Sequence, residues 1–225
     1  MLYQLVLALA ALASAGRQSS PHGSYAATFT VYGVGDANGS GDCNKAGACG
    51  TKFAPESYSA AVSQSLFGVG PNQGAGPACG KCYRITIGTR RQTPSQSVMS
   101  VQADSSACVE NDATSGKRLP NAGNSLVIKV KDLCPRKSHI SHPAHSIIPD
   151  MASAGGNGVC GQRTLSDKNQ YGAMVNFDLC KNSGAADAFF GNTGIGLATG
   201  HAEEVDCSAW RGRVLSTAPW ARGHP

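Results

Sequence analysis

The segment VNFDLC, which begins at Val175, carries the carboxylate with the clearest potential for chemistry in this chain. The alternation of a β-strand places Val175, Phe177 and Leu179 on one face and Asn176 and Asp178 on the other. Asp178 is therefore held rigidly near the end of an apolar strand. By itself the segment favours the simpler interpretation, a solvent-facing Asp on a half-buried strand, because such strands normally have one polar face.

A second carboxylate, Asp132, ends the strand pattern of residues 125–132. Apolar residues of this pattern alternate with Lys129 and Lys131, and Pro135 stops the ladder soon afterwards.

Two further patterns have weaker chemical interpretations. Cys79 and Cys82 form a CxxC pair, but neither a second close pair nor a following helix is present, so disulfides to two different partners are favoured over zinc or thioredoxin chemistry. His139, His142 and His145 could ligate a metal, yet an intervening proline interrupts any helix that would align them. We interpret that stretch as a solvated loop and expect no metal and no cofactor.

Composition indicates a β-rich, loop-heavy protein of one domain. The chain has 225 residues, 41% of them apolar and 15% charged, with 28 glycines. The net charge of +5 comes from scattered basic residues without interleaved aromatic residues, so nucleic-acid binding has weak support. Mild basicity would not repel an uncharged polysaccharide.

The N-terminal residues and the cysteines indicate secretion. Residues 1–15 have an apolar core and end in Ala-Ser-Ala, which is typical of a signal peptide, and no later segment is apolar enough to span a membrane. The nine cysteines all follow this segment and indicate disulfides in an oxidising compartment, with one cysteine left over. Asn38 begins a glycosylation sequon, Asn-Gly-Ser, which is weak evidence in the same direction.

The elements that must position the candidate residues are mostly short strands, which together suggest a small barrel. A turn at residues 169–172 leads into the strand of Asp178. We expect a leader at residues 16–26, a single domain at residues 27–210 and a tail at residues 211–225. Within the domain we expect strands at residues 27–32, 83–87, 125–132, 175–180 and 196–207, and short helices at residues 55–67 and 183–190.

Six of these segments together resemble a known family. The chain is similar to fungal endoglucanases of glycoside hydrolase family 45, most of all to their expansin-related branch, over about residues 27–210. The resemblance implies a mainly β fold, a six-stranded double-psi β-barrel with an open groove, that hydrolyses β-1,4-glucan with inversion. It rests on TFTVY from Thr28, ACGKCY from Ala78, VKDLCP from Val130, NQYG from Asn169, NFDLC from Asn176 and VDCSAW from Val205, in that order.

The resemblance also implies roles for the carboxylates. Asp178 matches the general acid, although Asn176 replaces a His of the family's segment, and Asp132 matches a carboxylate in the groove. Many members have their general base, an Asp, directly after the first-strand Tyr, where this chain has Gly33. In the expansin-related branch an Asn before a Cys-Gly-Gln segment is thought to serve instead, in its imidic-acid form, and Asn157 is the nearest match.

The remaining candidate residues are assigned to substrate binding. Tyr32 could be a platform on which a sugar stacks, or a core tyrosine whose hydroxyl is paired. Asn169 matches a second Asn of the groove, and Asp36 is the carboxylate nearest the missing base. The full set of substrate-binding candidates is Tyr32, Thr30, Asn169, Asn176, Tyr171 and Asp36.

Two other classes of protein fit the same segments. Expansins and loosenins loosen cell walls without hydrolysis, keep the Phe-Asp-Leu segment, and have a loop similar to the one that follows Tyr32. A barwin-like protein would share the barrel without a reason to keep Asp132, Asn157 and Asp178 together. We favour a secreted, monomeric hydrolase whose partner is β-glucan. The long stretches at residues 89–123 and 136–156 are interpreted as lineage-specific loops or retained intron sequence.

Overall fold

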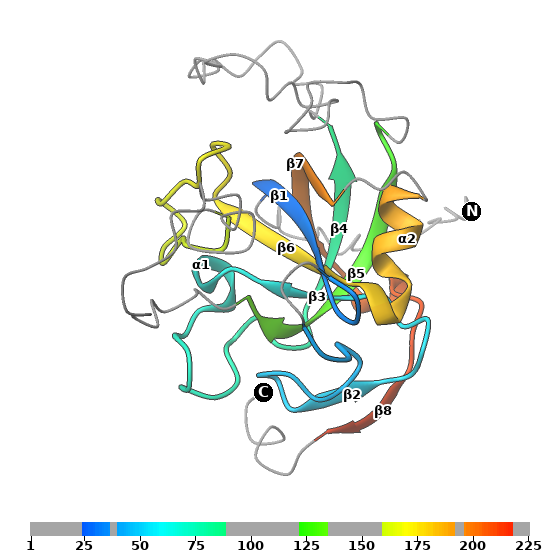
Figure 1. The fold of residues 1–225 in the computed structure, drawn as a ribbon. Helices are drawn as coiled ribbons and strands as arrows, with labels where there is room; N and C mark the ends of the chain where they lie inside the picture. Colours follow the sequence, from blue (N-terminus) through cyan, green and yellow to red (C-terminus); the bar gives the residue numbers. More distant parts are fainter. Residues whose placement is uncertain (1–23, 37–39, 89–121, 135–158, 192–195, 218–225) are drawn as a thin grey trace, which may run out of the picture.

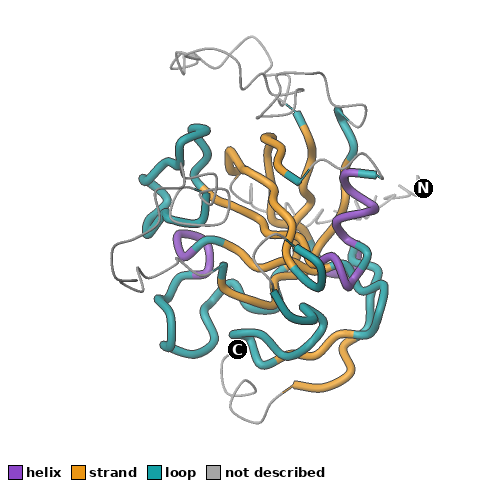
Figure 2. Tube along the Cα trace, viewed as in Figure 1, coloured by secondary structure: helices purple, strands orange, loops and turns teal. Residues whose placement is uncertain are grey.

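The fold is mainly β, and a closed barrel occupies its centre (Figures 1 and 2). The computed structural model describes residues 24–36, 40–88, 122–134, 159–191 and 196–217. The stretches expected as inserts lie almost wholly outside these ranges, as do the signal-peptide residues, Asn157, Cys108 and the three histidines. The strands are β1 (Ser24–Tyr32), β2 (Thr51–Phe53), β3 (Ser59–Val62), β4 (Cys82–Ile87), β5 (Ser125–Leu133), β6 (Val175–Cys180), β7 (Leu197–Val205) and β8 (Val214–Thr217).

In the part of the chain that the structure describes, helical structure is limited to short pieces around the barrel. The α-helices are α1 (Gln64–Phe67) and α2 (Ala185–Phe190), and 3₁₀ turns cover Lys181–Ser183 and Cys207–Ala209. Gly68 and Gly184 end α1 and the first 3₁₀ turn with positive φ angles, which glycine adopts without steric cost. No helix among the described residues is long and apolar enough to cross a membrane.

The barrel has the strand order β1-β6-β3-β5-β4-β7. β1 pairs with β6 and β3 pairs with β5 in parallel, and the other neighbouring pairs are antiparallel. This pattern is symmetric: exchanging β1 with β5, β3 with β6 and β4 with β7 reproduces the same set of pairings, each with its sense unchanged. The expected six-stranded double-psi β-barrel is thereby confirmed.

The interior of the barrel is filled by the faces that alternation predicts. Val175, Phe177 and Leu179 of β6 are fully buried in the core, where Phe177 packs against Phe29 of β1 and Tyr83 of β4. Helix α2 packs against β5 and β6 and adds its own phenylalanines to this core. The opposite face of β6, which carries Asp178, is therefore on the outside of the barrel.

Two expectations about elements are wrong. Residues 55–67 were expected to be helical, but residues 59–62 form β3, the central strand between β5 and β6, and only residues 64–67 are helical. Pairing on both sides of β3 overrides the helical spacing of its apolar residues. Part of the expected tail is also ordered: Val214–Thr217 forms β8, which pairs with β2 at one end of the molecule (Figure 1).

Four disulfides staple the loops to the barrel. They join Cys43 to Cys180, Cys49 to Cys79, Cys82 to Cys207, and Cys134 to Cys160. Cys79 and Cys82 bond to two different partners, as the sequence predicts. Cross-links over such long stretches of chain stabilise the fold chiefly by restricting the unfolded state.

Candidate active site

Register brings the two predicted carboxylates to one face of the barrel. Ala61 of β3 pairs with Asp178 of β6 on one side and with Asp132 of β5 on the other. Residues that face each other on neighbouring strands project to the same side of the sheet. With strands spaced about 4.8 Å apart, the two aspartate backbones are about 10 Å apart, and only the small Ala61 side chain stands between them.

A β-bulge turns Asp132 towards this face. The register of β3 and β5 passes from Ala60 opposite Val130 to Ala61 opposite Asp132, so Lys131 is the extra residue. Without the bulge, simple alternation would place Asp132 on the same side as the buried Val130. The extra residue reverses the phase of the strand, which is a known way to aim a side chain at a functional site.

The Asp178 carboxyl lies against an apolar wall. Its Oδ1 accepts a hydrogen bond from the Thr30 hydroxyl at 2.7 Å, and its Oδ2 lies 3.7 Å from Cys134 Sγ. The disulfide of Cys134 and Cys160 forms a small buried cluster with Ala61, and Tyr32 packs against it. Met174, which directly precedes β6, packs against the main core.

Burial in this setting raises the pKa of Asp178 to about 7. The Thr30 hydrogen bond lowers the pKa, whereas the negative charges of Asp36 and Asp132 raise it further. A carboxyl group with such a pKa keeps its proton near neutral pH, as a general acid must.

A chain of buried hydrogen bonds supports Thr30 from behind. Asn176 Nδ2 donates to Thr30 Oγ1 at 2.9 Å, and Asn176 Oδ1 accepts from the Thr28 hydroxyl at 2.8 Å. Thr28 Oγ1 in turn accepts from Asn169 Nδ2 at 2.8 Å. Asn176 is fully buried, so it supports Asp178 through Thr30 and is not itself on the surface of the site.

Asp132 is held by the backbone. Its Oδ1 accepts from the Ala48 N–H at 2.7 Å and from its neighbour's N–H, that of Leu133, at 2.9 Å. Burial raises the pKa of Asp132, while these two hydrogen bonds and the charge of Lys131 lower it. Among the described residues, both hydrogen bonds to this carboxylate go to Oδ1, so Oδ2 is the atom that remains for a ligand or a water molecule.

The Tyr32 hydroxyl is a second polar group of the site. Its oxygen is buried and has no hydrogen-bond partner among the described residues. Burial raises the pKa of Tyr32, and the charges of Asp132 and Asp178 raise it further. The hydroxyl therefore stays protonated and can donate to an acceptor placed near the two carboxylates.

The other candidates occupy the margins of this site. Asp36 accepts hydrogen bonds from the Gly33 and Ser40 N–H groups, so its carboxylate shapes the loop after β1. Tyr171 is partly exposed and donates its backbone N–H to Asn169 Oδ1 in the turn before β6. Among the described residues, no three His, Cys, Asp or Glu side chains are placed to bind a metal ion.

Sequence reasoning missed several parts of the site. Thr28 shares the alternating face of Thr30, and this signal could have identified it. No sequence pattern indicates the other three features, which are Ala61, the bulge at Lys131 and the Ala48 N–H. Each of them depends on which strands and loops become neighbours.

Comparison with known proteins identifies the family of this chain. The family model of EXPB1-like domain 1 matches residues 27–146 and 138–212. The chain belongs to the EXPB1-like domain 1 family. Its membership confirms the expansin-related part of the predicted resemblance. No curated protein sequence matches the chain.

Solved structures with a similar fold include two GH45 endoglucanases. Endoglucanase EG27II in complex with cellobiose is 22% identical over 81% of this chain and 80% of its own, with a TM-score of 0.45. Cel45A, a β-1,4-D-endoglucanase of the blue mussel Mytilus edulis, is 22% identical over 84% of this chain and 82% of its own, with a TM-score of 0.46. These similarities concern the fold alone.

Proposed function

We propose that this protein is a secreted endo-β-1,4-glucanase that hydrolyses cellulose or a related β-glucan with inversion, with Asp178 as the general acid. One observation carries the proposal: a carboxyl group with a pKa of about 7 faces a second carboxylate across a single intervening strand. Inverting glycosidases need one protonated acid and a second group that activates a water molecule, with the two groups about 6.5–9.5 Å apart.

The hydrogen bonds of Asp178 identify the oxygen that carries the acid proton. Thr30 accepts from Asn176 and donates its own hydrogen to Asp178 Oδ1, so Oδ1 is an acceptor. The acid proton is therefore on Oδ2. In the reaction it passes from Oδ2 to the glycosidic oxygen as the bond to the anomeric carbon breaks, while water attacks that carbon from the opposite face.

Three residues are candidates for the group that accepts the proton of the water. Asn157 is the one that the family resemblance implies, and it lies outside the described residues. Asp132 keeps Oδ2 available, whereas both oxygens of Asp36 already accept backbone hydrogen bonds. We expect Asn157→Ala to abolish activity and Asp36→Ala to preserve it; the reverse result would assign water activation to Asp36.

The test is release of reducing ends from soluble β-glucan by the purified protein, with the anomeric form of the fresh product followed by proton NMR. We expect α-anomeric ends from the wild type, an alkaline limb of kcat near pH 7, and a kcat at least about 10²-fold lower in Asp178→Asn. Equal inactivity of both proteins on several glucans would refute hydrolysis. Unchanged activity in Asp178→Ala would refute the assignment of Asp178 as the general acid, but it would leave the proposal of hydrolysis standing.

A non-hydrolytic protein that loosens cell walls is the second candidate. The EXPB1-like family match favours it, as does Gly33 in the position where many endoglucanases have their base. Creep of a wall specimen under load, without release of reducing ends, would distinguish this function from hydrolysis.

A further inference from the structure

We propose that residues 43–49 form a clamp that positions the Asp132 carboxylate, and that Gly47 is the residue that makes room for it. This inference rests on the proposed function only for its effect on activity; the geometry of the clamp is independent of that function.

Gly47 lies directly against the carboxylate. A Cβ atom at position 47 would be 2.4 Å from Asp132 Cγ and 2.5 Å from Oδ2, far closer than nonbonded atoms approach each other. The next residue, Ala48, donates its N–H to Oδ1. One oxygen is thus anchored by the clamp, and the other keeps its position only because residue 47 has no side chain.

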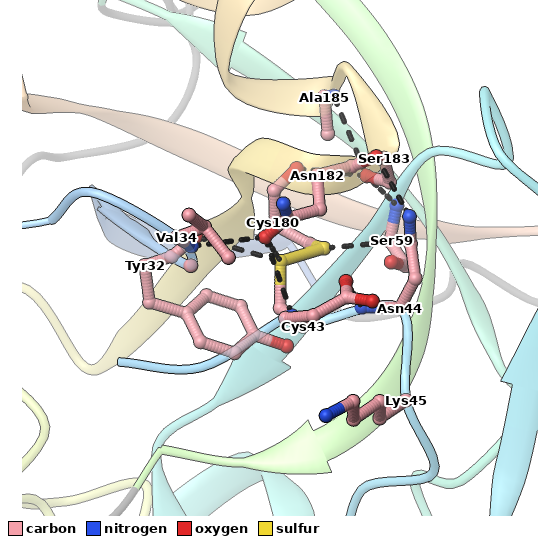
Figure 3. Close-up of a disulfide and its surroundings, with 12 residues drawn as sticks. Tyr32, Val34, Cys43, Asn44, Lys45, Ser59, Cys180, Asn182, Ser183 and Ala185 are labelled. Atoms are coloured by element: carbon pink, nitrogen blue, oxygen red, sulfur yellow. Dashed lines mark hydrogen bonds between the residues drawn. A yellow bond between two sulfur atoms is a disulfide. The ribbon is translucent and has the colours of Figure 1, made fainter. Parts of the chain in front are cut away.

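Both ends of the clamp are fixed by disulfides. Cys43 is bonded to Cys180 at the end of β6, and Cys49 is bonded to Cys79 before β4. Figure 3 shows the first of these bonds beside the Asn182 side chain, whose Oδ1 accepts the Cys43 N–H at 3.3 Å. The two disulfides therefore tie one end of the clamp to β6, the strand of the acid, and the other end to the residues that precede β4.

Lys131 fixes the clamp in the middle. This lysine is fully buried, and its Nζ donates to the carbonyl oxygens of Cys43 and Lys45. Its own carbonyl accepts the Cys49 N–H at 3.2 Å. The bulge thus has two consequences: it turns Asp132 towards the site and places the ammonium group of Lys131 beneath the loop that holds Asp132.

The groups around the Lys131 ammonium stabilise its charge, which allows it to hold the carbonyl oxygens of the clamp. Burial lowers the pKa of Lys131 to about 8, and the negative charges of Asp132 and Asp42 raise it. The ring of Phe53 lies 5.5 Å from Nζ. Two carbonyl oxygens and two nearby carboxylates offset part of the cost of burying the ammonium group.

The decisive experiment compares Gly47→Ala with Gly41→Ala. The control position is in the same loop, has no positive φ, and has no atom within 4 Å of the point where a Cβ would lie. We expect Gly47→Ala to lower kcat/KM about 10²-fold, as a displacement of about 1 Å can do, and Gly41→Ala to leave it unchanged. Equal activity of Gly47→Ala and the wild type would overturn the inference.

A double-variant cycle separates positioning from general damage. If Gly47→Ala acts through Asp132, its effect disappears once Asp132→Ala has removed the carboxylate, and the double variant matches Asp132→Ala within about twofold. Losses that multiply would show that Gly47→Ala damages the protein in another way, and would refute the clamp.

Hydrogen exchange at the Ala48 amide provides a measurement that does not depend on catalysis. We expect exchange at least about tenfold faster in Gly47→Ala and in Lys131→Met, because the bond to Asp132 is lost or loosened, and unchanged in Gly41→Ala and in the neighbouring Lys129→Met. Unchanged exchange in Gly47→Ala would overturn the clamp. An inactive wild type with the expected exchange pattern would refute hydrolysis and leave the clamp standing.

Discussion

The two carboxylates of the candidate site are held in opposite ways. Asp178 depends on side chains: a threonine hydroxyl backed by buried amides, and a disulfide wall that raises its pKa to about 7. Asp132 depends on backbone: two N–H groups, a glycine and a bulge. A group that must keep a proton needs an environment tuned by side chains, whereas a carboxylate that must point in a fixed direction can be held by the main chain.

The largest expected effect distinguishes the two carboxylates by activity. Asp178→Asn should lower kcat about 10²–10⁴-fold, because the amide has no proton to give. Asp132→Asn should cost only about 10–100-fold, the value of one hydrogen bond to a charged group. Steady-state kinetics on soluble glucan measures both, with melting temperature as the control for folding. A greater loss of kcat in Asp132→Asn than in Asp178→Asn would assign the role of general acid to Asp132.

Removal of one disulfide near each carboxylate tests whether the disulfide of Cys134 and Cys160 raises the pKa of Asp178. Cys134 and Cys160 are 26 residues apart, and Cys49 and Cys79 are 30 apart, so replacing either pair with alanine should cost a similar ~3–4 kcal/mol of stability. Only the first replacement opens the wall around Asp178. Its pKa should then fall, and the alkaline limb of kcat should move to lower pH.

The pH–rate profiles of the two double variants decide this point, with chemical denaturation to check that the stability losses match. An equal shift of the alkaline limb in both would mean that the disulfide of Cys134 and Cys160 has no special influence on Asp178.

The pH dependence of stability is expected to be smaller. An aspartate in an unfolded chain has a pKa of about 3.9, whereas Asp178 in the fold has one of about 7. The folded state thus binds the proton more tightly, and this stabilisation, complete below pH 4, is lost as pH rises to about 7. Between pH 4 and about 7, the free energy of unfolding should therefore fall less in Asp178→Asn than in the wild type. The difference should be about 2 kcal/mol, a value that allows for solvent screening of a partly exposed carboxyl.

Urea unfolding between pH 4 and 8 measures the decline, and Asp187→Asn, at an exposed carboxylate of α2, is the matched control. If wild type and Asp178→Asn lose stability in parallel across this range, Asp178 is not the group that titrates.

The smallest expected effect concerns Thr30. Thr30→Val keeps the shape of the side chain but removes the hydrogen bond that lowers the pKa of Asp178. The pKa should rise, so the alkaline limb of kcat should move to higher pH, and stability should fall by about 1 kcal/mol. Thr30→Ser keeps the hydroxyl and should keep the wild-type profile. A shift to lower pH in Thr30→Val would contradict the role of this bond.

The sequence by itself determined the strand of Asp178 and the face that this residue occupies. The alternation of Val175, Phe177 and Leu179 predicts which face of β6 enters the core, and all three side chains are fully buried there. The opposite face is more buried than alternation suggests, because Asn176 is fully buried as well. The different partners of Cys79 and Cys82 could also be predicted, because no metal or redox pattern competed with disulfides. Family resemblance supplied the pairing of Asp178 with Asp132.

Only the tertiary structure decided how Asp132 reaches the site. Local pattern placed it on the side of Val130, and the helical spacing of residues 55–67 concealed the strand that separates the two carboxylates. Bulges, cross-strand register and the approach of Gly47 depend on which segments become neighbours, and local sequence encodes none of these directly. The face occupied by the carboxylate that side chains hold could therefore be predicted from the sequence. Asp132 could be named as a candidate, but the way in which the main chain holds it could not be predicted.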